Sequence, residues 1–290
     1  MSEKINFAFF GTPDVASETL EILKESGFLP SLIITSPDKP QGRRMIVTPP
    51  PAKVWATENK IPYIQPEKLD REFTLKLSTF NFQLFVVVAY GHIIPKSILS
   101  LPKFGSINIH YSLLPKYRGA SPVESAILNG DTETGVTIQQ MEFKLDSGPI
   151  LAQEETIIAP DEKAPELRKR LIKIGGEMLV KILETPSLSE HSPSTRGRWE
   201  GEKQNESEAT YCSKIKKEDG LIDLENNPEK NYNKFRAYAT WPRTFFFINN
   251  KRVIITEATL ENNQFVIKKV LPEGKKEIRY EEFLRANTSK

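Results

Sequence analysis

The sequence predicts an α/β fold with a mostly parallel sheet, followed by a smaller β-rich domain. Short apolar runs alternate with stretches of helical periodicity over residues 1–184. Residues 185–208 are rich in Ser, Pro, Glu and Gly, which is typical of a connecting segment. Residues 209–290 contain short strand-like segments between Asn, Gly and Pro turns. We therefore expect an N-terminal domain at 1–184, a linker at 185–208 and a C-terminal domain at 209–290.

Most strands of the N-terminal domain are expected to be apolar on both faces, as in a parallel sheet that is covered by helices. The predicted strands are Ile5–Phe10, Leu32–Thr35, Leu84–Ala89, Gly105–His110 and Gly135–Met141. The predicted helices are Val15–Ser26, Glu72–Ser78, Ser121–Asn129 and Glu166–Leu183. Apolar residues recur at helical spacing in the last of these, so it should pack back on the sheet.

The C-terminal domain is predicted to be small and rich in strands, and a barrel is one form that such a domain can take. The predicted strands are Lys214–Asp223, Thr244–Ile248, Arg252–Thr256 and Gln264–Val270. One helix is predicted around Pro228–Ala239. This domain is the more basic part of the chain.

Composition excludes several classes of protein. With 38% hydrophobic residues, the chain can bury a full core, and a net charge of +2 argues against a strongly basic nucleic-acid coat. One cysteine excludes an internal disulfide, as expected in the reducing cytoplasm, and three scattered histidines argue against a metal centre. The longest apolar run, Leu84–Tyr90, is far too short to span a membrane. We expect a cytoplasmic protein without a metal.

A histidine and an amide share one face of a predicted strand. The period of two places Asn108 and His110 on the same face of Gly105–His110. A loop with Pro and Gly, Ser112–Gly119, follows at the carboxyl end of the strand, where open α/β sheets bind ligands. An Asn that caps local backbone and a histidine satisfied within the core are the alternative interpretations.

Other polar positions are less specific. Asp146 lies in a turn-prone stretch after an apolar strand, and its spacing alone does not show that it meets His110. The loop 37–51 contains Lys39, Arg43 and Arg44, so it is either a solvated loop or a cationic arm for phosphate. The turn after the first strand lacks the G-x-G-x-x-G pattern, which excludes a dinucleotide fingerprint. His92 and His191 are weaker candidates than His110.

Taken together, these residues resemble the methionyl-tRNA formyltransferase family over nearly the whole chain. The N-terminal motifs are Phe10-Gly11-Thr12-Pro13-Asp14, Val86-Val87-Val88-Ala89-Tyr90-Gly91, Ile107-Asn108-Ile109-His110, Ser112 to Pro122, Gly130-Asp131, Thr134 to Ile138 and Leu145-Asp146-Ser147-Gly148. The C-terminal motifs are Ala209-Thr210-Tyr211, Lys214-Ile215, Lys217-Glu218, Ile222-Asp223, Phe235-Arg236-Ala237 and Trp241-Pro242. The Ser-Leu-Leu-Pro-x-Tyr/Trp-Arg-Gly core is specific for folate-linked formyltransferases, and the later motifs separate the chain from single-domain relatives.

The resemblance implies a Rossmann-like formyltransferase domain and an OB-like β-barrel C-terminal domain that binds tRNA. It implies formyl transfer from 10-formyltetrahydrofolate to the methionine of initiator methionyl-tRNA, by a monomer and without a metal. Asn108 and a protonated His110 would stabilise the oxyanion. Asp146 would orient His110 and help to remove the amine proton.

The resemblance also implies where the two substrates bind. The folate would lie against Ser112, Leu113, Leu114 and Pro115, and against the backbone groups of Val88, Ala89, Tyr90 and Gly91. The tRNA phosphates would meet Lys39, Arg43 and Arg44.

Two features depart from the family pattern. The arm reads Gly42-Arg43-Arg44-Met45-Ile46, where the family usually has Gly-Arg-Gly followed by lysines. The C-terminal domain is shortened between Ala258 and Gln264. Two alternatives to the tRNA enzyme therefore stay open: a sugar-nucleotide N-formyltransferase that needs no tRNA, and a tRNA-binding protein that has lost its catalytic activity.

Overall fold

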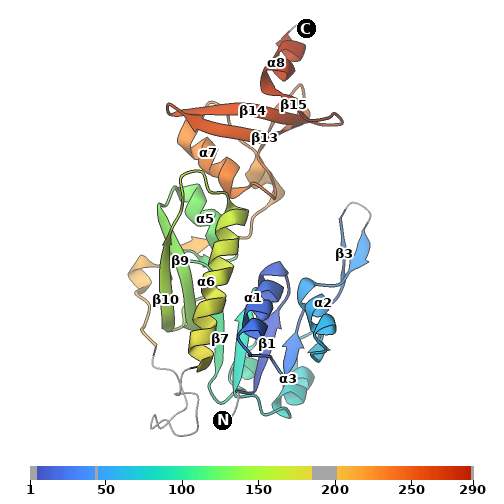
Figure 1. Ribbon diagram of the computed structural model, residues 1–290, viewed down its shortest axis with the longest axis vertical. Helices are drawn as coiled ribbons and strands as arrows, with labels where there is room; N and C mark the ends of the chain where they lie inside the picture. The colour runs from blue at the N-terminus through green and yellow to red at the C-terminus, as the bar shows by residue number, and fades with distance from the viewer. Residues whose placement is uncertain (1–4, 43–44, 185–200, 289–290) are drawn as a thin grey trace. The chain divides into compact units, whose positions relative to one another are not determined.

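The N-terminal part of the chain is built around a mixed sheet in a computed structural model that describes residues 5–42, 45–184 and 201–288 (Figure 1). Seven strands are ordered β10-β9-β7-β6-β1-β2-β5. Their bounds are β1 (Phe7–Gly11), β2 (Leu32–Ile34), β5 (Tyr63–Ile64), β6 (Leu84–Val88), β7 (Ser106–His110), β9 (Glu133–Gln140) and β10 (Ile150–Ile157). The pairs among β1, β2, β5, β6 and β7 are parallel, whereas β9 runs antiparallel to β7. The predicted α/β class with a mostly parallel sheet is confirmed.

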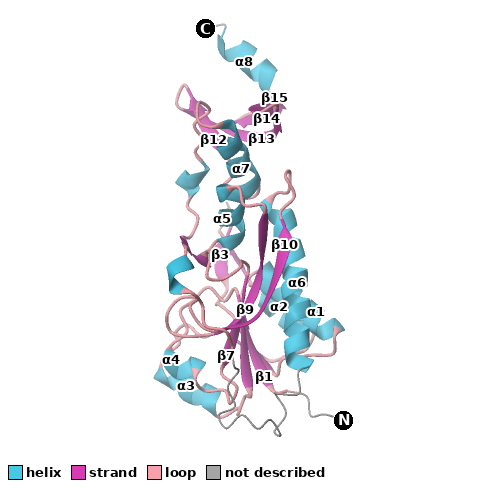
Figure 2. Cartoon of the chain, turned by 90° about the vertical axis from the view of Figure 1, so that its left-hand side faces the viewer, coloured by secondary structure: helices cyan, strands magenta, loops and turns pink. Residues whose placement is uncertain are grey.

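The four predicted helices are observed close to their expected bounds, as α1 (Asp14–Glu25), α3 (Arg71–Ser78), α5 (Pro122–Asn129) and α6 (Ala164–Glu184). Helices α2 (Pro51–Glu58) and α4 (Lys96–Leu99) were not predicted. Figure 2 shows α3 and α4 on one side of the sheet, with α1 and α6 on the other. This two-sided cover explains why strands β1, β2 and β6 are buried along their whole length.

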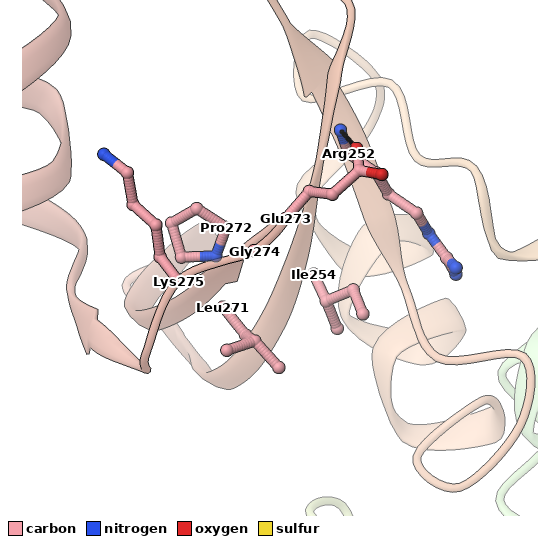
Figure 3. Close-up of a pocket in the computed structure, with 7 residues that line it drawn as sticks. All are labelled: Arg252, Ile254, Leu271, Pro272, Glu273, Gly274 and Lys275. Carbon is pink, nitrogen blue, oxygen red and sulfur yellow. Dashed lines mark hydrogen bonds between the residues drawn. The ribbon is translucent and has the colours of Figure 1, made fainter. Parts of the chain in front are cut away.

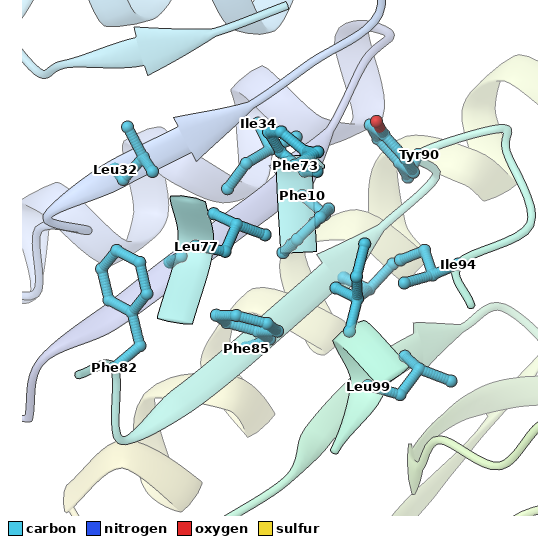
Figure 4. Packing of buried hydrophobic residues seen from close by; sticks show 13 residues of the cluster. Phe10, Leu32, Ile34, Phe73, Leu77, Phe82, Phe85, Tyr90, Ile94 and Leu99 are labelled. Atoms are coloured by element: carbon cyan, nitrogen blue, oxygen red, sulfur yellow. The ribbon is translucent and has the colours of Figure 1, made fainter. Parts of the chain in front are cut away.

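A cluster of buried apolar side chains fills the space between the sheet and helices α3 and α4 (Figure 4). Phe10 of β1 contacts Phe85 of β6, with ring centroids 5.1 Å apart, and contacts Tyr90 edge-on at 5.4 Å. Leu77 of α3 is part of the same cluster. Because alternate strand residues point this way, the cluster lies on one face of the sheet.

Two glycines let helix α6 approach the opposite face closely. A Cβ atom at Gly175 would lie 2.9 Å from Cγ2 of Ile109, and one at Gly176 would lie 2.7 Å from Cδ1 of Ile22 in α1. Ile109 therefore points toward α6. Its neighbours in β7, Asn108 and His110, consequently share the other face, as the period of two predicts.

The C-terminal part contains a four-stranded antiparallel sheet in the order β12-β13-β14-β15. The elements here are α7 (Pro228–Ala237), β12 (Phe245–Ile248), β13 (Lys251–Glu261), β14 (Gln264–Pro272), β15 (Ile278–Arg279) and α8 (Tyr280–Thr288). Asn249-Asn250 and Asn262-Asn263 form the two tight hairpin turns with positive φ angles, which asparagine tolerates. The predicted strand-rich C-terminal domain is therefore confirmed as an antiparallel sheet, and its closure into an OB-like barrel stays a prediction.

The predicted strand Lys214–Asp223 is wrong. Residues Lys217–Gly220 form a short 3₁₀ helix, η3, because the Asp219 carboxylate accepts a hydrogen bond from the Lys216 N–H at 2.7 Å. The sequence pattern also did not predict β5, β10, β15 and α8. Further elements that it did not predict are β3 (Lys39–Gln41), β4 (Ile46–Thr48), β8 (Arg118–Gly119), the 3₁₀ helix η2 (Glu206–Glu208) and β11 (Tyr211–Cys212).

The chain forms two compact units, and each unit is made of three separate segments of the sequence. The first comprises 1–118, 135–155 and 170–210, and the second comprises 119–134, 156–169 and 211–290. Most of the predicted linker, 185–200, lies outside the described residues, but 201–208 is described and belongs to the first unit. The functional division into 1–184, 185–208 and 209–290 stays a prediction.

We expect Leu77→Ala to lower the free energy of unfolding by about 2–5 kcal/mol, because it leaves a cavity in a closely packed cluster. Leu77 is 1% exposed. Leu75 on the same helix is 60% exposed, so Leu75→Ala is the matched control and should change the value by less than about 0.5 kcal/mol. Urea unfolding measures both values, and equal losses would contradict the assigned faces of α3.

Candidate active site

Strand β7 places Asn108 and His110 beside two neighbouring strands. Asn108 pairs with Val87 of parallel strand β6 and with Gln139 of antiparallel strand β9. His110 is opposite Thr137 and is 5% exposed, whereas Asn108 is half-buried. Within the described part of the chain, no hydrogen bond of the Asn108 amide is found. Its amide is therefore available to a ligand at the carboxyl end of the parallel strands.

The two ring nitrogens of His110 face different acceptors. Nε2 lies 2.8 Å from the backbone oxygen of Tyr117, and since a carbonyl only accepts, Nε2 carries a proton. Nδ1 lies 3.8 Å from Oδ2 of Asp146, which is too long for a direct hydrogen bond. Nδ1 is thus the nitrogen that can exchange a proton at this site. The structure brings His110 and Asp146 together, which spacing alone could not show.

Asp146 is held in a tight turn between β9 and β10. Its φ angle is +45°, a left-handed conformation that Asp adopts more readily than most residues. A Cβ atom at Gly148 would lie only 1.7 Å from the backbone oxygen of Gln140, so this position has room for glycine alone. The Gln139 side-chain amide donates to Oδ1 of Asp146 at 3.1 Å. The turn and this hydrogen bond leave Oδ2 facing His110.

The sequence pattern did not predict the polar side chains that contact the Asp146 turn. Arg118 is fully buried, and its guanidinium donates to Gln204 and Glu206. Hydrogen bonds from Arg118 and Lys144 lower the pKa of Glu206 to about 2, so it is ionised at neutral pH. Arg118 lies within the quoted Ser-Leu-Leu-Pro motif, but Gln204 and Glu206 lie in the predicted linker, where nothing singled them out.

The candidate folate loop, Ser112–Pro115, is fixed by hydrogen bonds. Thr137 donates to the backbone oxygen of Ser112 at 2.7 Å and accepts from the Leu114 N–H at 3.1 Å. Gln153 donates to Thr137 and to the backbone oxygen of Leu114 at 2.8 and 3.0 Å. Ser112 and Leu114 are buried, whereas Leu113 and Pro115 are partly exposed. The latter two are the side chains of this loop that can touch a ligand.

The turn after β6 carries the other candidate folate residues. Val88 is buried, Ala89 is exposed with a φ angle of +47°, and Gly91 has a φ angle of +82°. The Tyr90 ring belongs to the core, and burial raises the pKa of its hydroxyl to about 12. Its backbone oxygen accepts from Thr12 at 2.9 Å. Backbone groups and Ala89, rather than the Tyr90 ring, are what this turn presents to a ligand.

The predicted cationic arm is a hairpin formed by β3 and β4. Lys39 begins β3, whereas Arg43 and Arg44 lie outside the described residues. Three apolar side chains that follow them, Met45, Ile46 and Val47, are 67%, 62% and 63% exposed. The described part of the hairpin therefore presents exposed apolar side chains at the start of β4 and just before it.

The other candidate positions give weaker evidence for a functional site. His92, at the end of the β6 turn, lies 2.9 Å from the Ser36 hydroxyl. Among the described residues, no group of three or more His, Cys, Asp or Glu side chains that could hold a metal is found. No described helix is long and apolar enough to cross a membrane.

A surface pocket of about 280 Å³ lies in the C-terminal sheet, lined by residues such as Arg252, Ile254 and Leu271 (Figure 3). It contains none of the candidate catalytic residues.

Comparison with solved structures supports the fold. A methionyl-tRNA formyltransferase from Clostridium thermocellum superposes with a TM-score of 0.59 at 17% identity, covering 92% of this chain and 98% of that one. An N-formyltransferase from Helicobacter canadensis, in complex with folinic acid and dTDP-3-aminofucose, gives a TM-score of 0.64 at 22% identity, covering 89% and 88%. At these identities the likeness establishes the fold alone.

Comparison of sequences identifies the family. The formyl transferase model matches residues 3–183, and the model of the formyl transferase C-terminal domain matches residues 214–265. The methionyl-tRNA formyltransferase of Thermotoga maritima is 41% identical over 86% of this chain and 77% of its own length. That of Halalkalibacterium halodurans is 35% identical over 97% and 94%. This chain therefore belongs to the methionyl-tRNA formyltransferases, enzymes of the formyl transferase family.

Proposed function

We propose that the protein transfers the formyl group of 10-formyltetrahydrofolate to the amino group of methionine on initiator methionyl-tRNA, in the cytoplasm. The relatives that are 35–42% identical and bear the name methionyl-tRNA formyltransferase support this acceptor. Solved relatives of the fold in complex with folinic acid or tetrahydrofolic acid support a folate donor. The proposal also assigns catalysis to residues 1–184 and tRNA binding to 209–290, with a monomer as the acting species.

The observation that carries the proposal is the approach of His110 Nδ1 and Asp146 Oδ2 to 3.8 Å, on the face of β7 that also carries Asn108. With Nε2 committed to the Tyr117 carbonyl, Nδ1 and Oδ2 are two acceptors that face one another. A group with two N–H donors can bridge acceptors at this separation. A neutral primary amine has such a pair and keeps its lone pair for attack on a formyl carbon.

The chemistry of formyl transfer suits these three side chains. When the amine attacks, a C–N bond forms and the formyl oxygen becomes an oxyanion, to which the Asn108 amide can donate. Nδ1 of His110, assisted by Asp146, receives the one proton that the amine loses. A protonated Nδ1 then provides a second donor to the oxyanion or returns the proton to the folate nitrogen as its bond to the formyl carbon breaks. The step balances without a metal or a covalent enzyme intermediate.

The donor would bind between the two loops at the carboxyl ends of β6 and β7. Val88, Ala89, Tyr90 and Gly91 offer backbone donors and acceptors to a flat heterocycle. Leu113 and Pro115, beside buried Ser112 and Leu114, offer apolar contact. Because β6 and β7 are adjacent and parallel, both loops lie at the edge that carries Asn108.

The tRNA would be held mainly through phosphates. Lys39, Arg43 and Arg44 supply cations on the arm, and guanidinium groups suit bidentate contacts to phosphate. The exposed Met45 beside them can pack against an unstacked base, as apolar side chains do in other nucleic-acid complexes.

We expect the purified protein to form formylmethionyl-tRNA from 10-formyltetrahydrofolate and methionyl-initiator tRNA. Asn108→Ala should lower kcat by ~10²–10³, because one oxyanion donor is lost. His110→Ala should lower it by roughly 10²–10⁴, because the acid–base group is lost. Single-turnover assays measure the loss, with His191→Ala as a histidine control in the predicted linker. Full activity of His110→Ala would contradict the assigned site.

We expect the acceptor to be tRNA and not a sugar nucleotide. The same assay with dTDP-linked amino sugars in place of tRNA should give no product above the uncatalysed rate. Turnover of the amino sugar without tRNA would instead support the sugar-nucleotide alternative. Tight binding of tRNA with no transfer to either acceptor would support the catalytically inactive tRNA-binding protein.

We expect the triple variant Lys39→Ala, Arg43→Ala and Arg44→Ala to raise KM for tRNA and leave KM for the folate unchanged. Each lost phosphate contact should also lower the slope of log affinity against log salt by about 0.7–0.9. The control removes three exposed lysines elsewhere, at Lys76, Lys169 and Lys173. An equal effect of both triples on the salt slope would show that the arm makes no specific contribution.

A further inference from the structure

Arg118 is a fully buried cation whose described partners come from a distant stretch of chain. Its Nη2 donates to Oε1 of Gln204 at 2.7 Å and to Oε1 of Glu206 at 2.8 Å. Nε adds a hydrogen bond to Gln204 at 3.1 Å, and Nη1 adds one to Glu206 at 3.2 Å. Burying an arginine is costly unless its charge and its donors are matched. Residues 204–206 supply both a carboxylate and an amide oxygen.

The arginine fixes which way the Gln204 amide points. A guanidinium only donates, so the atom that faces Arg118 must be the amide oxygen. The amide nitrogen then points the other way, where it donates to the backbone oxygens of Asp146 at 2.9 Å and Gly148 at 2.7 Å. Gln204 thereby connects a buried cation to the backbone of the turn that carries Asp146.

A second glutamine, Gln139, continues the series of hydrogen bonds to the Asp146 carboxylate. The Gln204 amide nitrogen lies 3.3 Å from Oε1 of Gln139, and the Gln139 amide nitrogen donates to Oδ1 of Asp146. The donors therefore run in one direction, from Arg118 through Gln204 and Gln139 to Asp146. Each amide orientation is set by the one before it.

Glu206 provides a further contact to the turn that carries Asp146. Lys144, two residues before Asp146, donates to Oε2 of Glu206 at 2.5 Å, while Oε1 accepts from Arg118. One carboxylate thus joins the buried arginine to the turn. Together the contacts hold Asp146 by its backbone, by its carboxylate and by a neighbour in sequence.

We infer that Arg118, Gln204 and Gln139 form a positioning network for Asp146 during formyl transfer. The inference rests on the proposed catalytic function of Asp146. The network lets Oδ2 keep its distance from His110 Nδ1 and presents it to the incoming amine. A displacement of a catalytic group by about 1 Å can cost roughly 10²-fold in rate.

Gln204→Glu separates this role from a purely structural one. The glutamate still accepts from Arg118, so the buried charge stays paired, but it cannot donate to the Asp146 and Gly148 carbonyls. Asn205→Asp is the matched control, because it makes the same amide-to-acid change at an exposed neighbour. The Asn205 oxygen accepts from the Ser207 N–H, which aspartate also does, and the change removes only the exposed hydrogen bond from the Asn205 amide nitrogen to Glu208.

We expect Gln204→Glu to lower kcat by roughly 10- to 100-fold, with KM for folate and tRNA within about twofold of the parent. Amide hydrogen exchange of residues 141–149 should speed up, while the thermal midpoint stays close to that of Asn205→Asp. Unchanged kcat, or a loss of kcat that only follows the folded fraction, would overturn the inference.

The hydrogen-exchange measurement tests the positioning network independently of the proposed function. If the parent transfers no formyl group, the proposed function fails. The exchange comparison still shows whether Gln204 holds the Asp146 turn, and equal exchange in both variants would overturn the inference.

Discussion

The alternation of side chains along β7 is the constraint on which the candidate site depends. Ile109 packs against Gly175 of α6 and thereby fixes the face on which Asn108 and His110 lie. A shift of one residue in register would bury the polar pair under the helix and expose the isoleucines. The close approach that glycine permits in α6 therefore secures the polar face on the other side of the sheet.

The reversal of direction next to β7 supplies the rest of the site. Parallel β6 ends at the same edge and presents the turn that begins at Val88, as connections in α/β sheets do. Antiparallel β9 instead places side chains opposite those of β7. Gln139, opposite Asn108, reaches Asp146, and Thr137, opposite His110, holds the loop that begins at Ser112. One antiparallel strand thus supports both the proposed base and the proposed folate loop.

The sequence predicted features that depend on a local pattern, but it did not predict contacts between residues far apart in the chain. Continuous apolar runs predicted β1, β2 and β6, and the period of two predicted the face shared by Asn108 and His110. The Arg118–Gln204 pair spans 86 residues, and no periodicity links positions that far apart. Residues 204–206 carry composition typical of a linker, so their buried partner was not predictable. A local hydrogen bond from the Lys216 N–H to the Asp219 carboxylate also overrode the strand pattern at 214–223.

Residues 204–210, at the junction of the predicted linker and the predicted C-terminal domain, contact the surroundings of both members of the proposed acid–base pair. Thr210 accepts from the Tyr117 N–H through its hydroxyl at 2.8 Å, and its backbone oxygen accepts from the Arg118 N–H at 2.9 Å. The Tyr117 carbonyl, held in this way, determines the protonated nitrogen of His110. Gln204 holds Asp146 from the other side. One stretch of chain thus contacts both the loop that holds His110 and the turn that holds Asp146, so the gap for an amine is present before a substrate arrives.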